Sequence, residues 1–361
     1  MAPIFKSFSD LGLTEVDSLE AVARTPNSIL REAPEQTISG ELTVFEIDAD
    51  GFIEKIVGVG YVPPRRFYAN VSDIFYHPFC NIVTRDDEIV FEDTIAEMGR
   101  SFEAWPLNHL QLARVGNPQS RETLPKYWEP MILGGHSSFG IFGHFLLDML
   151  PLLVRYRPML NSGELKIGFF QVKDWIRDFF AVIDVDFDCV QTLAAQPTWF
   201  AHAVVSHHHS AKTTQYPCAN AEIAYAFLRD RVEDVNLFRR VFFLRGDAVK
   251  RLKNEAEVAA LFASRGFVVL DPQKFSVEKQ AEIMKHAEVF ASVFGSGFSL
   301  SPLMKPGVGK VIELAPSTII DYWLRRLLSR FDLEHYSIVY DGEAQTIDVG
   351  VLAKILDRIL S

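Results

Sequence analysis

Strands and helices alternate between Arg240 and Pro316, and this alternation constrains the fold more than any other feature of the sequence. Apolar runs at 241–244, 268–270 and 289–293 have the length and composition of buried strands. A helical stretch opens near Asn254 after the first run, and another runs from Ser276 to His286 after the second. Such alternation is typical of a sheet covered by helices, so the sequence predicts an α/β fold.

A second alternating region lies upstream. It contains an apolar helical stretch at 139–154, strand-like runs at 165–170 and 201–205, and helical stretches at 172–182 and 221–234. The first hundred residues look β-rich instead, with a hairpin predicted over 42–53. We therefore expect more than one domain, with a boundary between residues 215 and 238.

The third strand of the downstream region ends on a glycine turn that contains Gly295 and Gly297. Glycine allows backbone angles that are closed to other residues, so this turn can present N–H groups at the start of a helix. The N–H groups of Ser296, Gly297 and Phe298 are then expected to bind an anion, above all a diphosphate. A tight turn with no ligand is the alternative interpretation of such a short motif.

Basic residues gather just before this turn in the sequence, although the net charge of the chain is −11. Open α/β sheets bind ligands at the carboxyl ends of their strands, and arginine is shaped to bind phosphate oxygens. Arg245 is the favoured phosphate contact because it is the first polar residue after a buried strand. A solvated helix face is the alternative for Lys250 and Lys253. The cluster comprises Arg239, Arg240, Arg245, Lys250, Arg251 and Lys253, against the single acid Asp247.

Two further side chains are candidates for chemistry. His144 and Asp148 are four residues apart, so on a helix they share one face, and either could take a proton from a hydroxyl group. Asp148 is the preferred base with His144 as the positioning group; the reverse assignment and a purely structural histidine stay open. Glu313 is expected to end a strand, where its carboxylate could accept both hydroxyls of a ribose, or else pair with Arg325 and Arg326.

In order and approximate spacing, these motifs resemble glycosyltransferase family 61, over residues 130 to 320. One departure is Phe294, which stands where the family usually has histidine before the glycine turn. The amino half contributes Gly143 to Pro151, which is similar to the family's His-x-Leu-x-Asp-x-x-Pro helix. The carboxyl half contributes Phe243-Leu244-Arg245, Arg251, Asn254-Glu255, Gly266-Phe267, Gln280, Gly295-Ser296-Gly297 and Val311-Ile312-Glu313-Leu314.

The resemblance implies a GT-B-like α/β architecture, with two Rossmann-like domains facing a cleft and a β-rich N-terminal extension. The acceptor-side domain would span 1–225 and the nucleotide-sugar domain 226–345, while a last helix within 346–361 would pack back on the first domain. The activity implied is an inverting transfer of a hexosyl or pentosyl group from a nucleotide sugar to a saccharide hydroxyl, in polysaccharide or glycan biosynthesis. No metal or other cofactor is implied. The implied donor site comprises Arg245, Arg251, Asn254, Glu255, Gly295, Ser296, Gly297, Phe298 and Glu313.

Two other functions remain open. A catalytically silent nucleotide-binding or scaffold protein would account for Phe294. A metal-dependent hydrolase could use the pair Asp184 and Asp186 or the triplet at 207–209, His207-His208-His209. Consecutive strand residues point to opposite faces, so three adjacent histidines are poorly placed to bind one ion. We expect the aspartate pair to be a turn after a helix.

Composition narrows the class of partner and compartment. The acidic balance argues against nucleic-acid binding, which needs a basic face. Three scattered cysteines, Cys80, Cys189 and Cys218, favour a reducing compartment over a disulfide framework. No signal peptide or membrane span is evident, so we expect a cytoplasmic protein and leave peripheral membrane contact open. The sequence does not specify an oligomeric state.

Overall fold

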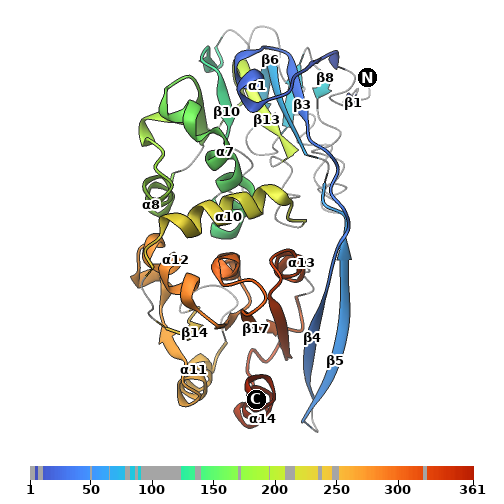
Figure 1. The fold of residues 1–361 in the computed structure, drawn as a ribbon, viewed down its shortest axis with the longest axis vertical. Coiled ribbons are helices and arrows are strands. Elements are labelled where there is room, and N and C mark those ends of the chain that lie inside the picture. Colours follow the sequence, from blue (N-terminus) through green and yellow to red (C-terminus); the bar gives the residue numbers. More distant parts are fainter. Residues whose placement is uncertain are drawn as a thin grey trace. The chain divides into compact units, whose positions relative to one another are not determined.

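The structure is a computed structural model that describes residues 5–6, 11–48, 51–64, 66–77, 82–85, 88–90, 123–134, 140–169, 172–194, 196–207, 216–234, 238–245, 252–319 and 323–361. The chain forms two compact units, coloured along the sequence in Figure 1. Unit 1 comprises Met1–Glu35 and Pro63–Thr214, and unit 2 comprises Gln36–Val62 and Gln215–Ser361. The chain therefore enters unit 2 twice.

Unit 2 contains a sheet of seven strands within the described residues, in the order β15-β14-β16-β17-β18-β4-β5. All neighbours are parallel except the hairpin of β4 and β5, so the strands predicted at 241–244, 268–270 and 289–293 are confirmed. The strands are β4 (Ile38–Asp48), β5 (Gly51–Tyr61), β14 (Arg240–Phe243), β15 (Val268–Leu270), β16 (Val289–Val293), β17 (Lys310–Pro316) and β18 (Glu334–Tyr340).

The first five strands of this sheet have the order 2-1-3-4-5 when they are numbered along the chain. In this topology the chain leaves the first strand in one direction and later returns on its other side. The strand order thus reverses between β14 and β16, and ligands of such sheets bind at the carboxyl ends of the two strands that flank the reversal.

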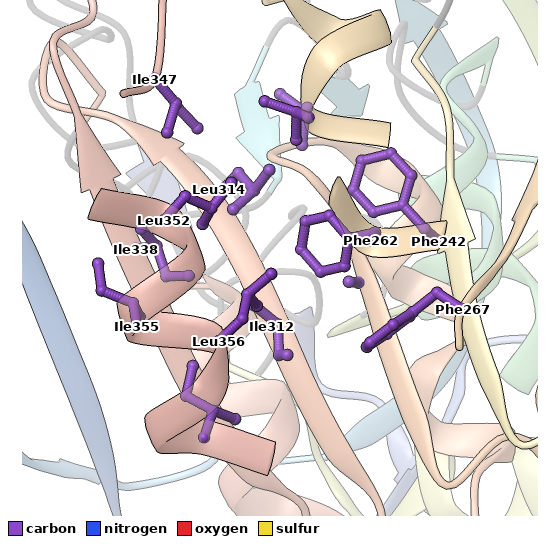
Figure 2. Close-up of a cluster of buried hydrophobic side chains, with 14 of the residues drawn as sticks. Phe242, Phe262, Phe267, Ile312, Leu314, Ile338, Ile347, Leu352, Ile355 and Leu356 are labelled. Carbon is purple, nitrogen blue, oxygen red and sulfur yellow. The ribbon is translucent and has the colours of Figure 1, made fainter. Parts of the chain in front are cut away.

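Helices cover both faces of the unit 2 sheet. One face packs against α11 and α14 in the cluster shown in Figure 2, where Leu352 and Leu356 of α14 lie among Ile312 and Ile338 of the strands. The other face carries η7, whose Phe298 ring contacts Phe290 of β16. The helices are α10 (Ala219–Arg231), α11 (Glu255–Ser264), η6 (Pro272–Lys274), α12 (Val277–His286), η7 (Ser296–Leu303), α13 (Trp323–Arg330) and α14 (Val349–Leu360).

These observations correct two expectations about the domains. The last helix packs in the core of unit 2, because its apolar stripe meets Ile312 and Ile338, so the expectation that it packs back on the first domain is wrong. The hairpin over 42–53 is confirmed as β4 and β5, but it extends the unit 2 sheet because β4 pairs with β18, so it does not belong to the N-terminal domain.

Unit 1 is built on a mixed sheet in the order β1-β8-β7-β6-β13-β10-β11-β12, to which β2, β3 and β9 are added. The strands β13, β10, β11 and β12 are parallel neighbours, and the rest of the main path is antiparallel apart from β1 and β8. The strands are β1 (Phe5–Lys6), β2 (Thr14–Glu15), β3 (Ser28–Arg31), β6 (Phe67–His77), β7 (Ile82–Arg85), β8 (Glu88–Val90), β9 (Lys126–Tyr127), β10 (Met131–Leu133), β11 (Lys166–Phe169), β12 (Val190–Thr192) and β13 (Thr198–Ser206).

The main helix of unit 1 runs through α6 (Phe142–His144), the π-helical turn η3 (Phe145–Met149) and α7 (Leu150–Asn161). It connects β10 to β11, and α8 (Asp174–Val182) and η4 (Phe187–Cys189) then lead to β12. The apolar stretch at 139–154 is thus a helix from Phe142 onward, and it is buried from Phe145 to Leu153, as predicted. None of the helices in the described ranges is long and apolar enough to span a bilayer.

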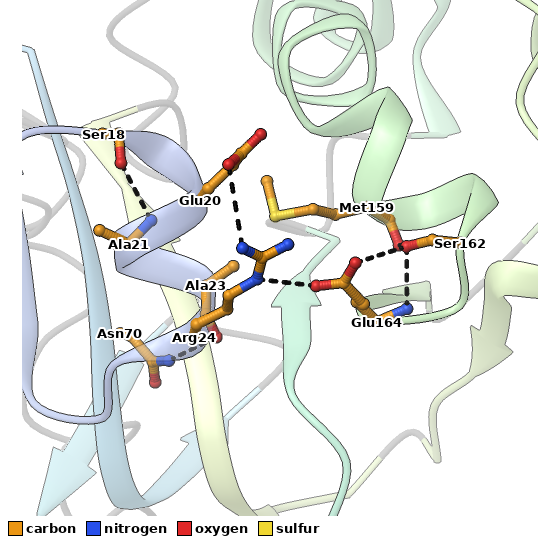
Figure 3. A network of polar contacts seen from close by, with 9 residues as sticks. All are labelled: Ser18, Glu20, Ala21, Ala23, Arg24, Asn70, Met159, Ser162 and Glu164. Atoms are coloured by element: carbon orange, nitrogen blue, oxygen red, sulfur yellow. Dashed lines mark hydrogen bonds and ion pairs between the residues drawn. The ribbon is translucent and has the colours of Figure 1, made fainter.

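Polar contacts hold the far end of this helix, as Figure 3 shows. Ser18 caps the short helix α1 (Leu19–Arg24) by accepting from the N–H of Ala21 at 3.2 Å. At the other end of α1, Arg24 donates to Glu164 at 2.9 Å, just after α7. The carboxylate of Glu164 has its pKa lowered, first by this hydrogen bond from Arg24. The contact ties α1 to the end of α7, whose start carries the candidate residues of unit 1.

Candidate active site

Arg245 and Gly295 meet where the strand order of unit 2 reverses. Arg245 follows β14, and Gly295 follows the adjacent strand β16. A Cβ atom on Gly295 would lie only 2.3 Å from Nη1 of Arg245, so the guanidinium group lies directly against the glycine backbone. The close approach of Arg245 is what requires glycine here. The backbone angles do not require it, because the residue is extended, with φ 160°. The predicted need for special backbone angles is therefore wrong at this residue.

The guanidinium group of Arg245 is half-buried and lacks a carboxylate partner among the described residues. Its Nε–H group is buried and donates to no hydrogen-bond acceptor in that part of the chain. Burial lowers the pKa of Arg245, and the negative charge of Glu255 partly opposes this. Since arginine stays cationic even so, the structure holds a desolvated positive charge, which is costly until an anion pairs with it.

Glu255 holds the backbone of this loop. Its carboxylate accepts a hydrogen bond of 2.7 Å from the backbone N–H of Arg245. The contact joins the start of α11 to the end of β14, so it fixes the direction in which the Arg245 side chain leaves the sheet. Glu255 therefore has an orienting role in the structure, and a direct contact with a donor stays a prediction.

The glycine turn begins the 3-10 helix η7. Phe298 donates its backbone N–H to the carbonyl group of Gly295 at 3.2 Å, and its side chain is fully buried. Phe298 is therefore not the anion contact that was predicted, because its N–H group is already bonded. The N–H groups of Ser296 and Gly297 precede this first hydrogen bond of the helix, as the first groups of any helix do. A Cβ on Gly297 would meet no atom within 4 Å, so the turn itself does not need glycine there.

Two side chains of helix α10 hold η7 by hydrogen bonds to its backbone carbonyl groups. Arg229 donates to the carbonyl groups of Pro302 at 3.0 Å and Leu303 at 3.1 Å, and Tyr225 donates its O–H to Ser299 O at 2.5 Å. Sequence reasoning missed both anchors. Their spacing of four residues places them on one helix face and was the available signal.

For the other three residues predicted to bind the donor, the structure shows contacts within unit 2 for Glu313 and Asn254 and does not describe Arg251. The strand β17 continues past Glu313 to Pro316, and the buried carboxylate of Glu313 lies 3.2 Å from Nε2 of the buried His335, so the predicted strand-end position is wrong. Asn254 bonds through its amide to the backbone of Ile347, at 2.9 Å as donor and 3.2 Å as acceptor. Arg251 lies outside the described residues. Contacts of Asn254, Arg251 and Glu313 with a donor stay predictions.

In unit 1, His144 and Asp148 are in direct contact. Nδ1 of His144 lies 2.9 Å from Oδ2 of Asp148. The Asp148 side chain is completely buried, whereas 22% of the His144 side chain is exposed. The predicted pairing on one helix face is therefore present, and the histidine is the member that reaches the surface of the unit.

Asp148 lies within a π-helical turn, and His144 directly precedes it. The N–H of Leu150 bonds to the carbonyl group of Phe145, five residues earlier. Pro151 has no N–H to donate to the carbonyl of Leu147, so the ordinary helical pattern is interrupted here. π-Helical turns inside α-helices are frequent at functional sites. On the other side of the turn, Phe145 packs against Trp175 and Phe179 of α8, with ring centroids 5.3 Å and 5.2 Å apart, which fixes the start of the helix.

The position of the pair follows from the topology of unit 1. The helix that carries it follows β10, and β10 lies between β11 and β13. Because β13 comes last along the chain, the order of the parallel strands reverses between β10 and β13. His144 and Asp148 thus follow a strand that flanks the reversal, as Arg245 does in unit 2.

The residues considered for a metal site have structural roles where they are described. Asp184 has φ 55° and accepts from Arg157 at 2.8 Å, and Asp186 accepts from the N–H of Asp188 at 2.9 Å. His207 is buried at the end of β13, and His208 and His209 lie outside the described residues. No group of three potential ligands is present in the part of the chain that the structure describes.

The predicted site residues thus form two sets, and each unit holds one. In unit 2 the structure brings together Arg245, Glu255, Gly295, Ser296 and Gly297. In unit 1 it brings together His144 and Asp148. The first set offers positive charge and N–H groups, which suit an anion. The second offers a histidine oriented by a carboxylate, which suits proton transfer.

Comparison with known proteins gives one informative match, to a family model. No curated protein matches the sequence of this chain. Two structures of TibC are similar, each with a TM-score of 0.29, which is too low to inform the fold or chemistry of this chain. One is a dodecameric iron-containing heptosyltransferase in complex with ADP-D-β-D-heptose, 11% identical over 89% of this chain and 86% of that chain. The other, from enterotoxigenic E. coli H10407, is 12% identical over 93% and 97%.

The match that carries information is to the family described as Glycosyltransferase 61, over residues 142–312. This region begins at the helix of His144 and Asp148 and includes Arg245 and the glycine turn. The resemblance drawn from the ordered motifs is therefore confirmed, since the model of glycosyltransferase family 61 matches residues 142–312 of this chain.

Proposed function

We propose that this protein is an inverting glycosyltransferase that moves a hexosyl or pentosyl group from a nucleotide sugar to a saccharide hydroxyl, in polysaccharide or glycan biosynthesis. The observation that carries the proposal is the half-buried guanidinium group of Arg245, without a carboxylate partner among the described residues and pressed against Gly295. A desolvated cation beside N–H groups at the start of a helix is suited to a diphosphate. The similarity to glycosyltransferase family 61 favours a diphosphate that is part of a nucleotide sugar.

In the proposed mechanism, unit 2 holds the donor. Arg245 and the N–H groups of Ser296 and Gly297 face the diphosphate, and their charge stabilises it as the bond to the anomeric carbon breaks. No metal ion is required for this role, because the cation and the N–H groups balance the departing charge. Glu255 keeps Arg245 in place through its backbone N–H.

Unit 1 supplies the base. We assign this role to His144, with Asp148 orienting the ring through Nδ1, because only His144 retains exposed surface. Nε2 of His144 takes the proton of the acceptor hydroxyl while its oxygen attacks the anomeric carbon from the side opposite the diphosphate, which inverts the configuration. Asp148 fixes the tautomer and stabilises the imidazolium that forms, as carboxylates do in other His–Asp pairs. The two-domain GT-B architecture is part of this proposal.

Donor binding tests the proposal. UDP, GDP, ADP and CMP are screened by thermal shift, since a ligand that binds the folded state raises its melting temperature, and the best ligand is then titrated calorimetrically. Arg245→Ala should weaken binding by about 1.5–3 kcal/mol, the usual value of a charge-assisted hydrogen bond. Arg240→Ala is the matched control. Arg240 lies at the amino end of β14, the strand that Arg245 follows, and its guanidinium group donates to the carbonyl group of Arg265.

If the parent binds a nucleotide and Arg245→Ala binds it with the same affinity, the assignment of Arg245 to the donor site is refuted. Nucleotide binding without transfer or donor hydrolysis would instead support the silent nucleotide-binding protein. The specific observation in favour of that second function is Phe294, which is buried with 7% exposure where the family usually has histidine.

A further inference from the structure

Two tryptophans, Trp128 and Trp199, lie on the opposite face of the unit 1 sheet from Phe200 and the hydrophobic cluster that contains it. In the pairing of β13 with β9, Trp199 is opposite Lys126 and Phe200 is opposite Tyr127. Phe200 and Tyr127 stack on each other at 5.3 Å and belong to the core. Because side chains alternate along a strand, Trp199 and Trp128 both face the other way.

The two indole rings form a corner. Their centroids are 4.8 Å apart and their planes meet at 67°. Trp128 is 70% exposed. Trp199 is held in place by a hydrogen bond of 2.5 Å from its Nε1–H to Oδ1 of Asp73 on β6. We refer to Asp73, Trp128 and Trp199 as the tryptophan corner.

Asp73 itself has an unusual backbone. Its φ is 58°, in the left-handed region that L-residues other than glycine seldom adopt. Such strain persists only where the surroundings impose it, and it is concentrated at binding and catalytic sites. Among the described residues Oδ2 of this exposed carboxylate has no hydrogen-bond partner. The corner therefore presents aromatic surface beside an available acceptor.

These groups match one class of ligand. A sugar ring has apolar C–H faces, which pack on aromatic rings, and a rim of hydroxyl groups, which donate to carboxylates. Two indole side chains together offer roughly 300–500 Å² of surface. A stable protein interface buries about 1,200 Å² or more, so the corner is too small to hold a second protein.

We propose that the tryptophan corner binds a neutral oligosaccharide, at a site separate from the reacting groups. The inference deepens the proposed function. It rests on that function in one respect, which is that the bound sugar is taken to be a remote part of the saccharide acceptor. Trp199 lies near the amino end of β13, and the strand reversal lies at its carboxyl end near Ser206. Seven residues of strand separate them by about 23 Å. An acceptor chain held at the corner would raise the effective concentration of its reacting end.

The test is binding of the full-length protein to an array of neutral and acidic oligosaccharides, followed by calorimetric titration of the best neutral oligosaccharide. Trp128→Ala should weaken this binding by about tenfold or more, as removal of a central aromatic contact does. Trp128→Phe should restore part of it. Ile56→Ala is the matched control, because Ile56 is 69% exposed and lies on β5 of unit 2. It should bind as the parent does.

Three outcomes would overturn the inference. The parent could fail to bind the array, or Trp128→Ala could bind with the affinity of the parent. The third outcome is that the parent sediments as a dimer and Trp128→Ala as a monomer, which would make the corner a contact between copies of the chain. Arg245→Ala separates this inference from the proposed function. If it retains sugar binding but loses nucleotide binding, both stand. If it keeps nucleotide binding while Trp128→Ala loses the sugar, only the donor assignment fails.

Discussion

The two units place their candidate groups at the same topological position but use different chemistry there. In each unit the groups follow a strand that flanks a reversal of the parallel order, β10 in unit 1 and β14 in unit 2. Unit 2 offers a guanidinium group, N–H groups and a glycine that allows close approach. Unit 1 offers a buried carboxylate and a half-buried histidine.

The difference teaches how each set should respond to substitution. Several groups share the anion in unit 2, so losing one should weaken binding without abolishing it. The proton in unit 1 passes through one pair of side chains, in which Asp148 acts through His144. A single substitution should therefore cost more in unit 1 than in unit 2, and the loss should appear in turnover and leave donor affinity unchanged.

The largest expected effect is on His144. His144→Gln should lower turnover by about 10² to 10⁴, the usual contribution of a general base, with donor affinity unchanged. Asp148→Asn should also lower turnover, because the ring would lose its orienting carboxylate, and the double variant should be no slower than His144→Gln because the two residues act as a unit. Turnover is measured with a matched donor and acceptor, and melting temperature reports whether each variant is folded.

The opposite result would reverse the roles. If His144→Gln retained near-parental turnover while Asp148→Asn lost it, Asp148 would be the base, as the sequence first favoured. If both variants retained turnover, the pair would be part of the core, and unit 1 would not carry a catalytic group at the position that corresponds to Arg245 in unit 2.

The second prediction concerns the core of unit 2. Leu356 of α14 is completely buried in the cluster of Figure 2, so Leu356→Ala should destabilise unit 2 by about 2–5 kcal/mol. Calorimetry should show a lower transition temperature for unit 2 and an unchanged one for unit 1. Lys354→Ala, on the exposed side of the same helix, is the control. A shift confined to the unit 1 transition would mean that the last helix supports the first domain after all.

The third prediction separates the two glycines of the turn. Gly295→Ala should displace the guanidinium group of Arg245 and weaken nucleotide binding by about 1.5–3 kcal/mol, the value of a charge-assisted hydrogen bond. Gly297→Ala adds a Cβ that meets no protein atom, so it should leave stability unchanged or raise it by about 0.4–1 kcal/mol. Equal nucleotide affinity of Gly295→Ala and the parent would show that Arg245 does not need its present position.

The sequence predicted those parts of the molecule that depend on local pattern. The strands at 241–244, 268–270 and 289–293 and the pairing of His144 with Asp148 follow from periodicity over a few residues. The membership of β4 in unit 2 does not, because it rests on pairing between Leu42 and His335 across nearly the whole chain. No local signal specifies that register.

The same limit applies within the candidate site. Glu313 looked like a strand end because the apolar run stops there, but pairing with β18 carries the strand on to Pro316. The buried His335 that meets its carboxylate comes from that neighbouring strand. The support that Arg229 gives to η7 likewise depends on the packing of α10, which the charge pattern of the helix alone does not reveal.

The smallest expected effect is a pH dependence in unit 2. Burial, and to a lesser degree the negative charge of Glu255, raises the pKa of Tyr340 to about 12, whereas an unfolded tyrosine titrates near 10. Between these values the unfolded chain has lost the proton and the folded chain retains it, so stability is full below pH 10 and falls as pH rises toward 12. At pH 11 the loss should be roughly 1 kcal/mol. Denaturant unfolding of the parent and Tyr340→Phe at pH 9 and pH 11 measures it. The variant should lose less stability than the parent over this interval. An equal loss in both would show that Glu255 and the buried end of β18 do not hold Tyr340 in its neutral form.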